Sequence, residues 1–286
     1  MKISQILHLD DVLELILDAV CVVDKENNLV FVSAAFEHMF GYLPEEVIGR
    51  SVFDFIYVED KQKTSTTVDS ILLGQTQTSF ENRWLHKSGK IVHVLWSARW
   101  SEQHQLRIAV AHDITARKQM EQHLEYLAKH DPLTLLPNRA TVNERLQKSL
   151  VGARASDANL HVLFIDVDKF KQINDNHSHS IGDQVLQQIA QRLLNCVRDS
   201  DTVGRIGGDE FIVLLNNISS TETVLNLAQK MCSAVAKPFQ ILGLSLDLSL
   251  SIGIASYPEH GRNSETLLQL ADDAMYQAKK QVAIES

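Results

Sequence analysis

The segment that most constrains the fold reads Arg-Ile-Gly-Gly-Asp-Glu-Phe at residues 205–211 and continues with Ile-Val-Leu-Leu at residues 212–215. Two consecutive glycines supply the positive φ angles that a tight β-hairpin needs. The apolar run after them has the branched composition of a buried strand. The segment therefore predicts a strand, a two-glycine reversal and a returning strand. Asp209 and Glu210 stand at the tip, where carboxylates contribute little to folding but are well placed to bind metal ions.

A second predicted strand upstream also ends in carboxylates. Residues 162–168 read Val-Leu-Phe-Ile-Asp-Val-Asp, so the apolar run ends in Asp166 and Asp168. If this strand lies beside the hairpin, Asp166 and Asp209 converge on one point. Oxygen ligands of this kind suit Mg²⁺ together with a bound phosphate ester.

The second half of the chain resembles one family, block after block. Residues 207–211 are the signature of the GGDEF domain. Similar blocks stand in the family's order at residues 131–139, 166–171, 174–183, 251–255 and 271–279. The resemblance identifies residues 131–286 as a GGDEF domain with a palm-like α/β (α+β) fold. It implies a diguanylate cyclase, which joins two GTP molecules into cyclic di-GMP and releases pyrophosphate.

The resemblance also implies roles for individual residues. Mg²⁺ (or Mn²⁺) would be held by Asp166, by the backbone carbonyl of Val167 and by Asp209. Asp209 or Glu210 would take the proton of the attacking 3′-hydroxyl, and Lys171 would stabilise the developing charge. The residues implied in GTP binding are Lys169 and Phe170 through their main-chain amides, Asn174 and Asp183 at the guanine edge, His179 in the nucleotide loop, and Lys279 at a phosphate.

Two of these positions have plainer explanations without the family. Asn174 would be a turn residue, and Asp183 would be a charge favoured near a helix N-terminus. The family pattern assigns no role to Asp168, which is expected to shape the loop.

Two positions depart from the family pattern. Ser178 stands before His179 where glycine is usual, and glycine tolerates backbone angles that serine does not. The loop is therefore expected to sit differently. Ala283 stands where a second phosphate-binding arginine is expected, and losing one charge-assisted contact costs on the order of 1.5–3 kcal/mol. Because the acidic set is complete, the sequence still predicts an active enzyme.

Arg198 and Asp201 form an Arg-x-x-Asp pattern shortly before the hairpin. The family places its product-binding inhibitory site there, and an arginine fork meets guanine O6 and N7 bidentately. The alternative is that Arg198 caps a helix predicted over residues 181–197, where a cation is favoured, and that Asp201 starts a turn.

The first half reads as a small α/β domain. Strands are predicted over residues 19–24, 29–33, 79–86, 90–100 and 105–112, with short helices between the second and third. Residues 36–50, 80–89 and 113–115 resemble a PAS domain. Its input stays unknown: Cys21 lacks the context of a photoreactive flavin site, residues 54–70 contain no histidine for haem, and Trp84, Trp96 and Trp100 are explained as core and sheet residues or as a stacking surface for a flavin.

Residues 113–130 connect the halves. Arg117, Met120, Leu124 and Leu127 recur at alternating three- and four-residue spacing, which suits a short helix that pairs with its twin. The predicted organisation is a PAS domain with an N-terminal helix at residues 1–116, a helical linker at 117–130 and the GGDEF domain at 131–286, working as a homodimer.

The composition limits the partners. The formal net charge of −9 argues against a nucleic-acid-binding surface. Nothing approaches the roughly 20 apolar residues of a membrane span, and residues 3–20 read as an amphipathic helix, so we expect a cytoplasmic protein. Cys21, Cys196 and Cys232 are expected to be small core residues. The alternatives to the enzyme are a catalytically silent effector that binds GTP or cyclic di-GMP, and a scaffold that acts through PAS dimerisation.

Overall fold

The computed structural model describes residues 16–285, and the side chains of residues 16–280. The chain divides into two compact units between His123 and Leu124. Residues 3–15 of the predicted N-terminal helix lie outside the described residues, and Ile16 and Leu17 precede the first strand without helical structure. The predicted domain boundaries remain predictions.

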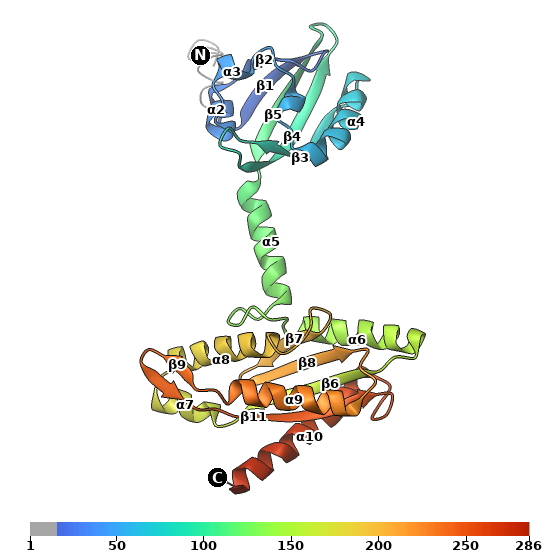
Figure 1. Ribbon diagram of the computed structural model, residues 1–286. Coiled ribbons are helices and arrows are strands. Elements are labelled where there is room, and N and C mark those ends of the chain that lie inside the picture. Colours follow the sequence, from blue (N-terminus) through green and yellow to red (C-terminus); the bar gives the residue numbers. More distant parts are fainter. Residues whose placement is uncertain (1–15, 286) are drawn as a thin grey trace, which may run out of the picture. The chain divides into compact units, whose positions relative to one another are not determined.

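The first unit is built on one antiparallel sheet in the order β2-β1-β5-β4-β3 (Figure 1). Its helices are short and lie between β2 and β3 in the chain, as the sequence predicts. The strands are β1 (Ala19–Asp24), β2 (Leu29–Val32), β3 (Gln77–Leu85), β4 (Ile91–Ser101) and β5 (Leu106–Asp113). The helices are α2 (Ala34–Phe40), α3 (Pro44–Val47) and α4 (Lys61–Leu72), with 3₁₀ turns η2 (Val52–Asp54) and η3 (Val58–Asp60).

Aromatic side chains fill the core of this unit. Alternate residues of β4 and β5 are buried, as expected for a sheet with one covered face. Trp84 packs between Phe40 and Trp96, with ring centroids 5.0 and 5.1 Å away. Trp84 and Trp96 therefore serve as core residues, whereas Trp100 is only partly buried.

Helix α5 (Thr115–Lys129) covers the predicted linker segment and contains no buried residue. Met120, Leu124 and Leu127 are 67%, 59% and 39% exposed. The apolar stripe predicted from the sequence is thus uncovered within the described part of the chain.

The second unit contains a four-stranded antiparallel sheet in the order β11-β6-β8-β7 and a separate two-stranded hairpin. The strands of the larger sheet are β6 (Leu160–Val167), β7 (Thr202–Gly207), β8 (Glu210–Asn216) and β11 (Leu250–Tyr257). The small hairpin consists of β9 (Phe239–Ile241) and β10 (Leu244–Leu246). The helices are α6 (Arg139–Ser156), α7 (Phe170–Asn176), α8 (His179–Leu194), α9 (Thr221–Val235) and α10 (Ser264–Glu285).

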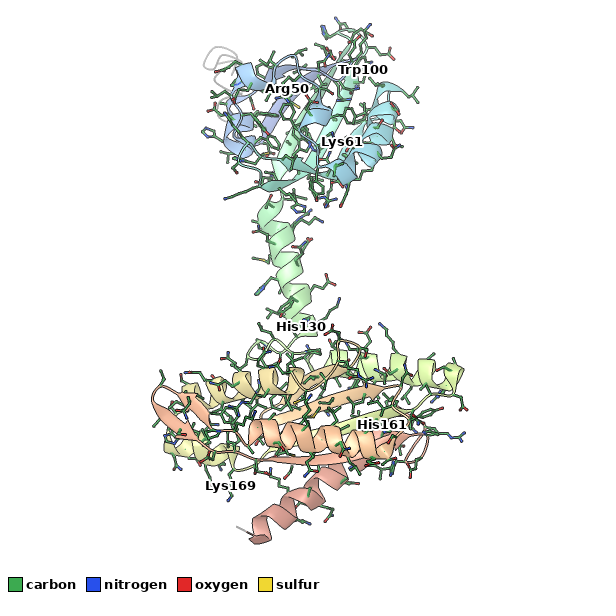
Figure 2. The ribbon with its side chains drawn as sticks, viewed as in Figure 1. Arg50, Lys61, Trp100, His130, His161 and Lys169 are labelled. Atoms are coloured by element: carbon green, nitrogen blue, oxygen red, sulfur yellow. The ribbon has the colours of Figure 1, made fainter. Side chains whose placement is uncertain are left out.

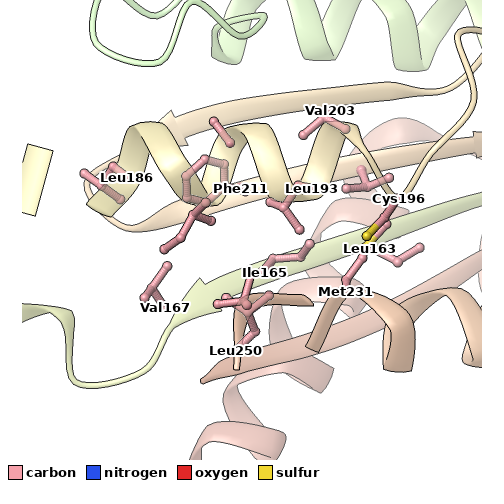
Figure 3. Close-up of a cluster of buried hydrophobic side chains, with 14 of the residues drawn as sticks. Leu163, Ile165, Val167, Leu186, Leu193, Cys196, Val203, Phe211, Met231 and Leu250 are labelled. Carbon is pink, nitrogen blue, oxygen red and sulfur yellow. The ribbon is translucent and has the colours of Figure 1, made fainter. Parts of the chain in front are cut away.

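Helices cover both faces of this sheet, which is why β6 is buried along its whole length. Odd-numbered strand residues such as Ile165 and Phe211 pack with α8 and α9, and Figure 3 shows this layer. Even-numbered residues such as Phe164 and Ile212 pack with α6 and α10. The alternation puts Asp166 and Glu210 on the second face, toward α6 and α10.

Two sequence predictions about this unit need correction, and two helices were missed. Alternating apolar residues over 245–255 predict one continuous strand, but residues 247–249 have no strand structure, and β10 and β11 belong to different sheets. The helix predicted over 181–197 ends at Leu194, where Asn195 provides the C-cap. Helices α6 and α7 were not predicted at all; α6 has a weak amphipathic pattern, although Asn138 caps its start by accepting from the Thr141 N–H at 3.0 Å.

Candidate active site

The hairpin brings the predicted acidic residues together. Gly207 and Gly208 adopt φ angles of 154° and 52°, so both need glycine. In the β6–β8 register Glu210 pairs directly with Asp166. The N–H of Val167 donates to the carbonyl of Asp209 at 3.3 Å. The predicted convergence of Asp166 and Asp209 is confirmed.

The side chain of Arg205 holds the hairpin tip in place. Its guanidinium donates to the Gly208 carbonyl from Nε at 3.0 Å and from Nη2 at 2.6 Å. Its Nη1 binds both carboxylate oxygens of Asp131, at 2.9 and 3.1 Å. Burial alone raises the pKa of Asp131, but hydrogen bonds from Thr134 and the Arg205 charge outweigh it and hold that pKa below its ordinary value. Sequence reasoning noted this arginine and this aspartate but assigned them no role.

Lys279 reaches the first carboxylate from α10. Its Nζ lies 2.5 Å from Asp166 Oδ1, so the residue predicted for a phosphate pairs with a predicted metal ligand in this structure. The approach depends on Gly253 of β11: a Cβ there would stand 2.0 Å from the Ala271 carbonyl oxygen and 2.1 Å from the Met275 nitrogen. The missing side chain lets α10 lie directly on β11 and carries Lys279 to the end of β6.

Negative charge accumulates around Asp166 and Glu210. Burial raises the pKa of Asp166, the Lys279 ammonium opposes this, and the charge of Asp209 raises it again. Burial also raises the pKa of Glu210, with further contributions from Asp166, Asp272 and Asp209. Glu210 lines a cavity of about 330 Å³ together with Arg139, Asn143 and Asp272. The site thus holds more negative charge than its own cations balance.

Asp168 faces different partners. Its carboxylate accepts hydrogen bonds from Ser249 Oγ at 2.5 Å and from Ser251 Oγ at 2.7 Å, and its N–H donates to the Ser249 carbonyl at 3.0 Å. These bonds tie the end of β6 to the start of β11. Asp168 shapes the loop, and sequence reasoning missed its two serine partners.

The segment after β6 exposes backbone donors. Lys169 has a φ of 59° and precedes α7, and it lies at the opposite end of β6 from His161 (Figure 2). Within the described residues, the amides of Lys169, Phe170 and Lys171 make no hydrogen bond to the protein. The side chains of Lys169 and Lys171 are exposed, whereas the ring of Phe170 is buried. The availability of these three backbone amides agrees with the predicted contact to phosphates.

Asn174 and the start of α8 lie together. A Cβ on Gly182 would stand 2.0 Å from Asn174 Oδ1, so the absent side chain makes room for this amide. Asn174 Oδ1 is buried and has no hydrogen-bond partner among the described residues. Asp183 follows Gly182 and is exposed, as is His179 at the first position of α8.

Ser178 does not need the backbone angles of a glycine. Its φ of 175° is an extended backbone that any residue adopts, and its hydroxyl caps α8 by accepting from the Ile181 N–H at 3.4 Å. Serine therefore begins the helix without strain. Ala283 lies within α10, but its side chain is outside the described residues.

Arg198 and Asp201 are brought together by a turn. Asp201 accepts from the Arg198 N–H at 3.1 Å and from the Asn216 N–H at 3.4 Å. Both side chains line a cavity of about 250 Å³ that Lys230 also borders. Because α8 ends at Leu194, Arg198 lies four residues beyond the helix, and the helix-cap explanation is wrong. Asp201 does hold the turn, as the alternative proposed.

The donor set at the end of β6 and β8 fits a hard divalent cation. Two carboxylates, Asp166 and Asp209, with the Val167 carbonyl between them in sequence, offer oxygen only. Among residues 16–280 no cluster of three or more His, Cys, Asp or Glu side chains has the arrangement of a metal site, so substrate oxygens would have to complete the coordination. In the same part of the chain, no helix has both the length and the apolar composition needed to cross a bilayer.

Family comparisons agree with the geometry. The family described as "Diguanylate cyclase, GGDEF domain" matches residues 128–283. The PAS fold matches residues 29–110.

Individual relatives cover different parts of the chain. Diguanylate cyclase TpbB of Pseudomonas aeruginosa is 46% identical over 159 residues, which is 55% of this chain and 37% of TpbB. Cyclic di-GMP phosphodiesterase PdeR of Escherichia coli K12 is 29% identical over 279 residues, 92% of this chain and 40% of PdeR. The chain thus spans well under half the length of these relatives.

A solved structure supports the same assignment. The GGDEF domain of TpbB superimposes with a TM-score of 0.52 at 46% identity, covering 53% of this chain and 89% of that structure. The GGDEF match extends over more than half of the chain and includes every block quoted above for the GGDEF domain. This chain therefore belongs to the GGDEF family of diguanylate cyclase domains, with a PAS fold ahead of the GGDEF domain.

Proposed function

We propose that the protein is a diguanylate cyclase that condenses two GTP molecules into cyclic di-GMP. The 3′-hydroxyl oxygen of each GTP forms a bond to the α-phosphorus of the other. The bond from that phosphorus to the bridging oxygen breaks, and pyrophosphate leaves from each nucleotide. The observation that carries the proposal is the carboxylate cluster of Asp166, Asp209 and Glu210, which strand register and the hairpin fix at one end of the sheet.

Each group in the site has a proposed task. Asp209 or Glu210 accepts the proton of the 3′-hydroxyl, and the raised pKa of Glu210 suits a group that must bind and release one. The free amides of residues 169–171 and the ammonium of Lys171 hold phosphate oxygens. Lys279 exchanges its pairing with Asp166 for a phosphate when GTP binds. His179, Asn174 and Asp183 line the base side.

Mg²⁺ or Mn²⁺, held by Asp166, Asp209 and the Val167 carbonyl, would supply charge neutralisation at the phosphates and activation of the 3′-hydroxyl. The support is the crowding of acidic groups at these oxygens: burial, together with the charge of Asp209, raises the pKa of Asp166 even though Lys279 is paired with it.

The direct test incubates the purified chain with GTP and Mg²⁺ or Mn²⁺ and identifies the product by mass spectrometry. We expect cyclic di-GMP and two pyrophosphates for each product formed. The absence of product with either metal, from protein that still binds GTP, would contradict the proposal and favour an effector.

The reaction requires two GTP-loaded domains, so we propose a homodimer. The uncovered stripe of Met120, Leu124 and Leu127 on α5 offers a pairing surface. Sedimentation of the wild type and of Leu124→Glu would test it, since a charge in the stripe should shift the equilibrium to monomers.

Two forms of regulation belong to the proposal. Cyclic di-GMP would bind at Arg198 and Asp201, where the exposed guanidinium borders a cavity large enough to receive part of a base. The PAS domain would act as the input module.

The effector that binds GTP or cyclic di-GMP without turnover remains the second candidate. PdeR, which matches nearly the whole chain, is named as a phosphodiesterase, and Ala283 departs from the family pattern. Ser178 no longer supports this candidate, because it caps α8 without strain.

A further inference from the structure

A cation at the start of α6 flanks the acid cluster on the side opposite to Lys279. In the sheet order β11-β6-β8-β7, α10 packs on β11 and β6, whereas α6 packs on β7 and β8. Asp166 of β6 and Glu210 of β8 pair in the middle of this row. Lys279 therefore reaches the pair from the β11 side, and Arg139, the first residue of α6, stands on the β7 side.

Close packing of α6 on β7 determines where Arg139 begins. A Cβ on Gly204 of β7 would overlap the side chain of Val142 in α6 and would stand 2.8 Å from the Pro137 carbonyl oxygen. Gly204 thus lets α6 lie directly on the sheet, as Gly253 does for α10. The backbone that carries Arg139 is therefore held against the sheet beside the acid cluster.

The GGDEF domain does not use the guanidinium of Arg139 for its own ion pairs. Arg139 is exposed, and the ion pairs within the described residues occupy Arg205 and Lys279 but not Arg139. Together with Asn143 and Glu210 it lines the cavity of about 330 Å³. Burial and three neighbouring carboxylates raise the pKa of Glu210, and the charge of Arg139 opposes them. One cation thus stays available beside a cavity at the acid cluster.

The proposed reaction indicates what arrives on this side of the cluster. In phosphoryl transfer the attacking and the leaving oxygens lie roughly in line, on opposite sides of the phosphorus. The leaving pyrophosphate would lie with Lys279 and with the amides of residues 169–171, which follow β6. The attacking 3′-hydroxyl therefore arrives from the side of α6. It belongs to the GTP of the second domain, and that nucleotide brings its own α-phosphate with it.

We propose that Arg139 binds the α-phosphate of the GTP held by the other subunit, so that each active site is completed by the partner subunit's Arg139. This inference rests on the proposed cyclase function. A guanidinium meets two phosphate oxygens at once, and an arginine supplied in trans stabilises the charge that develops during phosphoryl transfer. Because a two-fold axis relates two identical subunits, the same contact forms at both α-phosphates.

Mixed dimers separate action in trans from action within one subunit. Asp166→Asn disables phosphoryl transfer to the GTP of its own subunit, so a mixed dimer forms only one of the two bonds. The 3′-oxygen of the GTP on the Asp166→Asn subunit bonds to the α-phosphorus on the other subunit, pyrophosphate leaves, and the hydroxyl proton passes to Asp209 or Glu210. The product is a linear dinucleotide with a 5′-triphosphate, whose initial rate of formation is measured by chromatography and mass spectrometry.

Two mixtures distribute the same substitutions differently. The first combines Arg139→Gln with Asp166→Asn, and there the reacting phosphate faces an intact arginine in the partner, so the linear dinucleotide should form readily. The second combines the wild type with the double variant Asp166→Asn/Arg139→Gln. There the partner lacks the arginine, and formation should be about 10²–10³-fold slower. The wild type mixed with Asp166→Asn alone, which also yields the linear dinucleotide, verifies that subunits exchange.

Single variants distinguish this contact from a structural role. Dimers of Arg139→Gln should make cyclic di-GMP about 10²-fold more slowly than the wild type, with an unchanged thermal midpoint. Arg139→Lys keeps the charge without the fork and should recover about tenfold of that loss. Arg262→Gln removes an exposed arginine ahead of α10 and should leave the rate unchanged.

Four outcomes would overturn the proposal while leaving the cyclase in place. They are a faster second mixture, which would put Arg139 in the same subunit as its phosphate, equal rates in the two mixtures, wild-type turnover of Arg139→Gln, and no recovery in Arg139→Lys. In each of them the wild type still makes cyclic di-GMP in the same assay. A wild type that makes no product would instead contradict the proposed function, and this inference with it.

Discussion

Asp60 of the PAS domain and Asp166 of the GGDEF domain are buried to the same degree, at 3% and 5% exposure, yet their surroundings act on them in opposite directions. Hydrogen bonds from Arg83 lower the pKa of Asp60 to about 2, with Lys63 adding to the effect. Burial and the neighbouring Asp209 raise the pKa of Asp166 despite its pairing with Lys279. A carboxylate whose charge is fully balanced by cations of the same protein stabilises the fold. A carboxylate that lacks such cations is available to bind a cationic ligand.

The environment of each carboxylate explains this difference. Arg83 binds Asp60 through Nε at 3.0 Å, Nη2 at 2.8 Å and its backbone N–H at 2.7 Å, so the whole carboxylate is occupied. At the end of β6 and β8, three acidic side chains share Lys279 and the more distant Arg139. The comparison predicts that loss of Asp60 affects stability and that loss of Asp166 affects chemistry.

The largest effect is expected from Asp166→Asn. Removing a proposed metal ligand should lower cyclic di-GMP synthesis by about 10²–10³-fold or more. The fold should survive, because the change relieves repulsion among the acids. Initial rates and the thermal midpoint of the purified variant measure the two quantities. Asp247→Asn, at an exposed acid in the segment between β10 and β11, is the matched control. Near-wild-type turnover of Asp166→Asn in Mg²⁺ would refute the assignment.

Arg205→Met tests the ion pair between Arg205 and Asp131 of the GGDEF domain. In this pair an arginine balances the carboxylate, as Arg83 balances Asp60. The variant leaves Asp131 without its cation and frees the Gly208 carbonyl, which should cost about 2–4 kcal/mol of unfolding free energy. Activity should fall as well, since the hairpin tip carries Asp209. Far-UV circular dichroism in urea reports the stability change. If Arg205→Met unfolds at the wild-type urea concentration, the guanidinium does not fix the tip.

Asp60→Asn should destabilise the PAS domain by on the order of 2 kcal/mol at neutral pH. The folded pKa of Asp60 lies below its unfolded value, so this stabilisation is present above about pH 4 and is lost as the pH falls from about 4 to about 2. Tryptophan fluorescence in urea follows this domain alone, since Trp84, Trp96 and Trp100 all belong to it.

The control for this measurement is Asp69→Asn, at an exposed acid of α4. A stability difference between wild type and Asp60→Asn that does not shrink on acidification would show that the effect is steric and not electrostatic.

The smallest effect on rate is expected from Arg198→Ala. The initial rate, measured before product accumulates, should be nearly unchanged, while inhibition by added cyclic di-GMP should weaken about tenfold or more with the loss of a bidentate contact. Arg154→Ala, on the exposed end of α6, serves as a control for a lost surface arginine. Equal product sensitivity in wild type and Arg198→Ala would leave Arg198 without a role in feedback.

The sequence by itself determined the local elements and the acidic residues. Strand β6 was predicted from the apolar run that ends at Asp166, because a continuous apolar run is readable without knowing its neighbours. The paired glycines predicted the hairpin, since few other residues adopt the positive φ angles of its turn. Periodicity failed at residues 247–249, where Ser249, between β10 and β11, donates a hydrogen bond to Asp168 of a distant segment.

Only the tertiary structure decided which charged and polar side chains have a partner that balances them. Asp166 and Asp168 are equivalent in the sequence, two residues apart at the end of one strand. Contacts with residues more than 80 positions away make one a tether to Ser249 and Ser251 and leave the other beside Lys279. Arg107 is one more charge in the sequence, and it becomes a buried cation only through its register with β1. A pKa depends on what lies within a few ångströms of the charge, and folding brings those groups from distant parts of the chain.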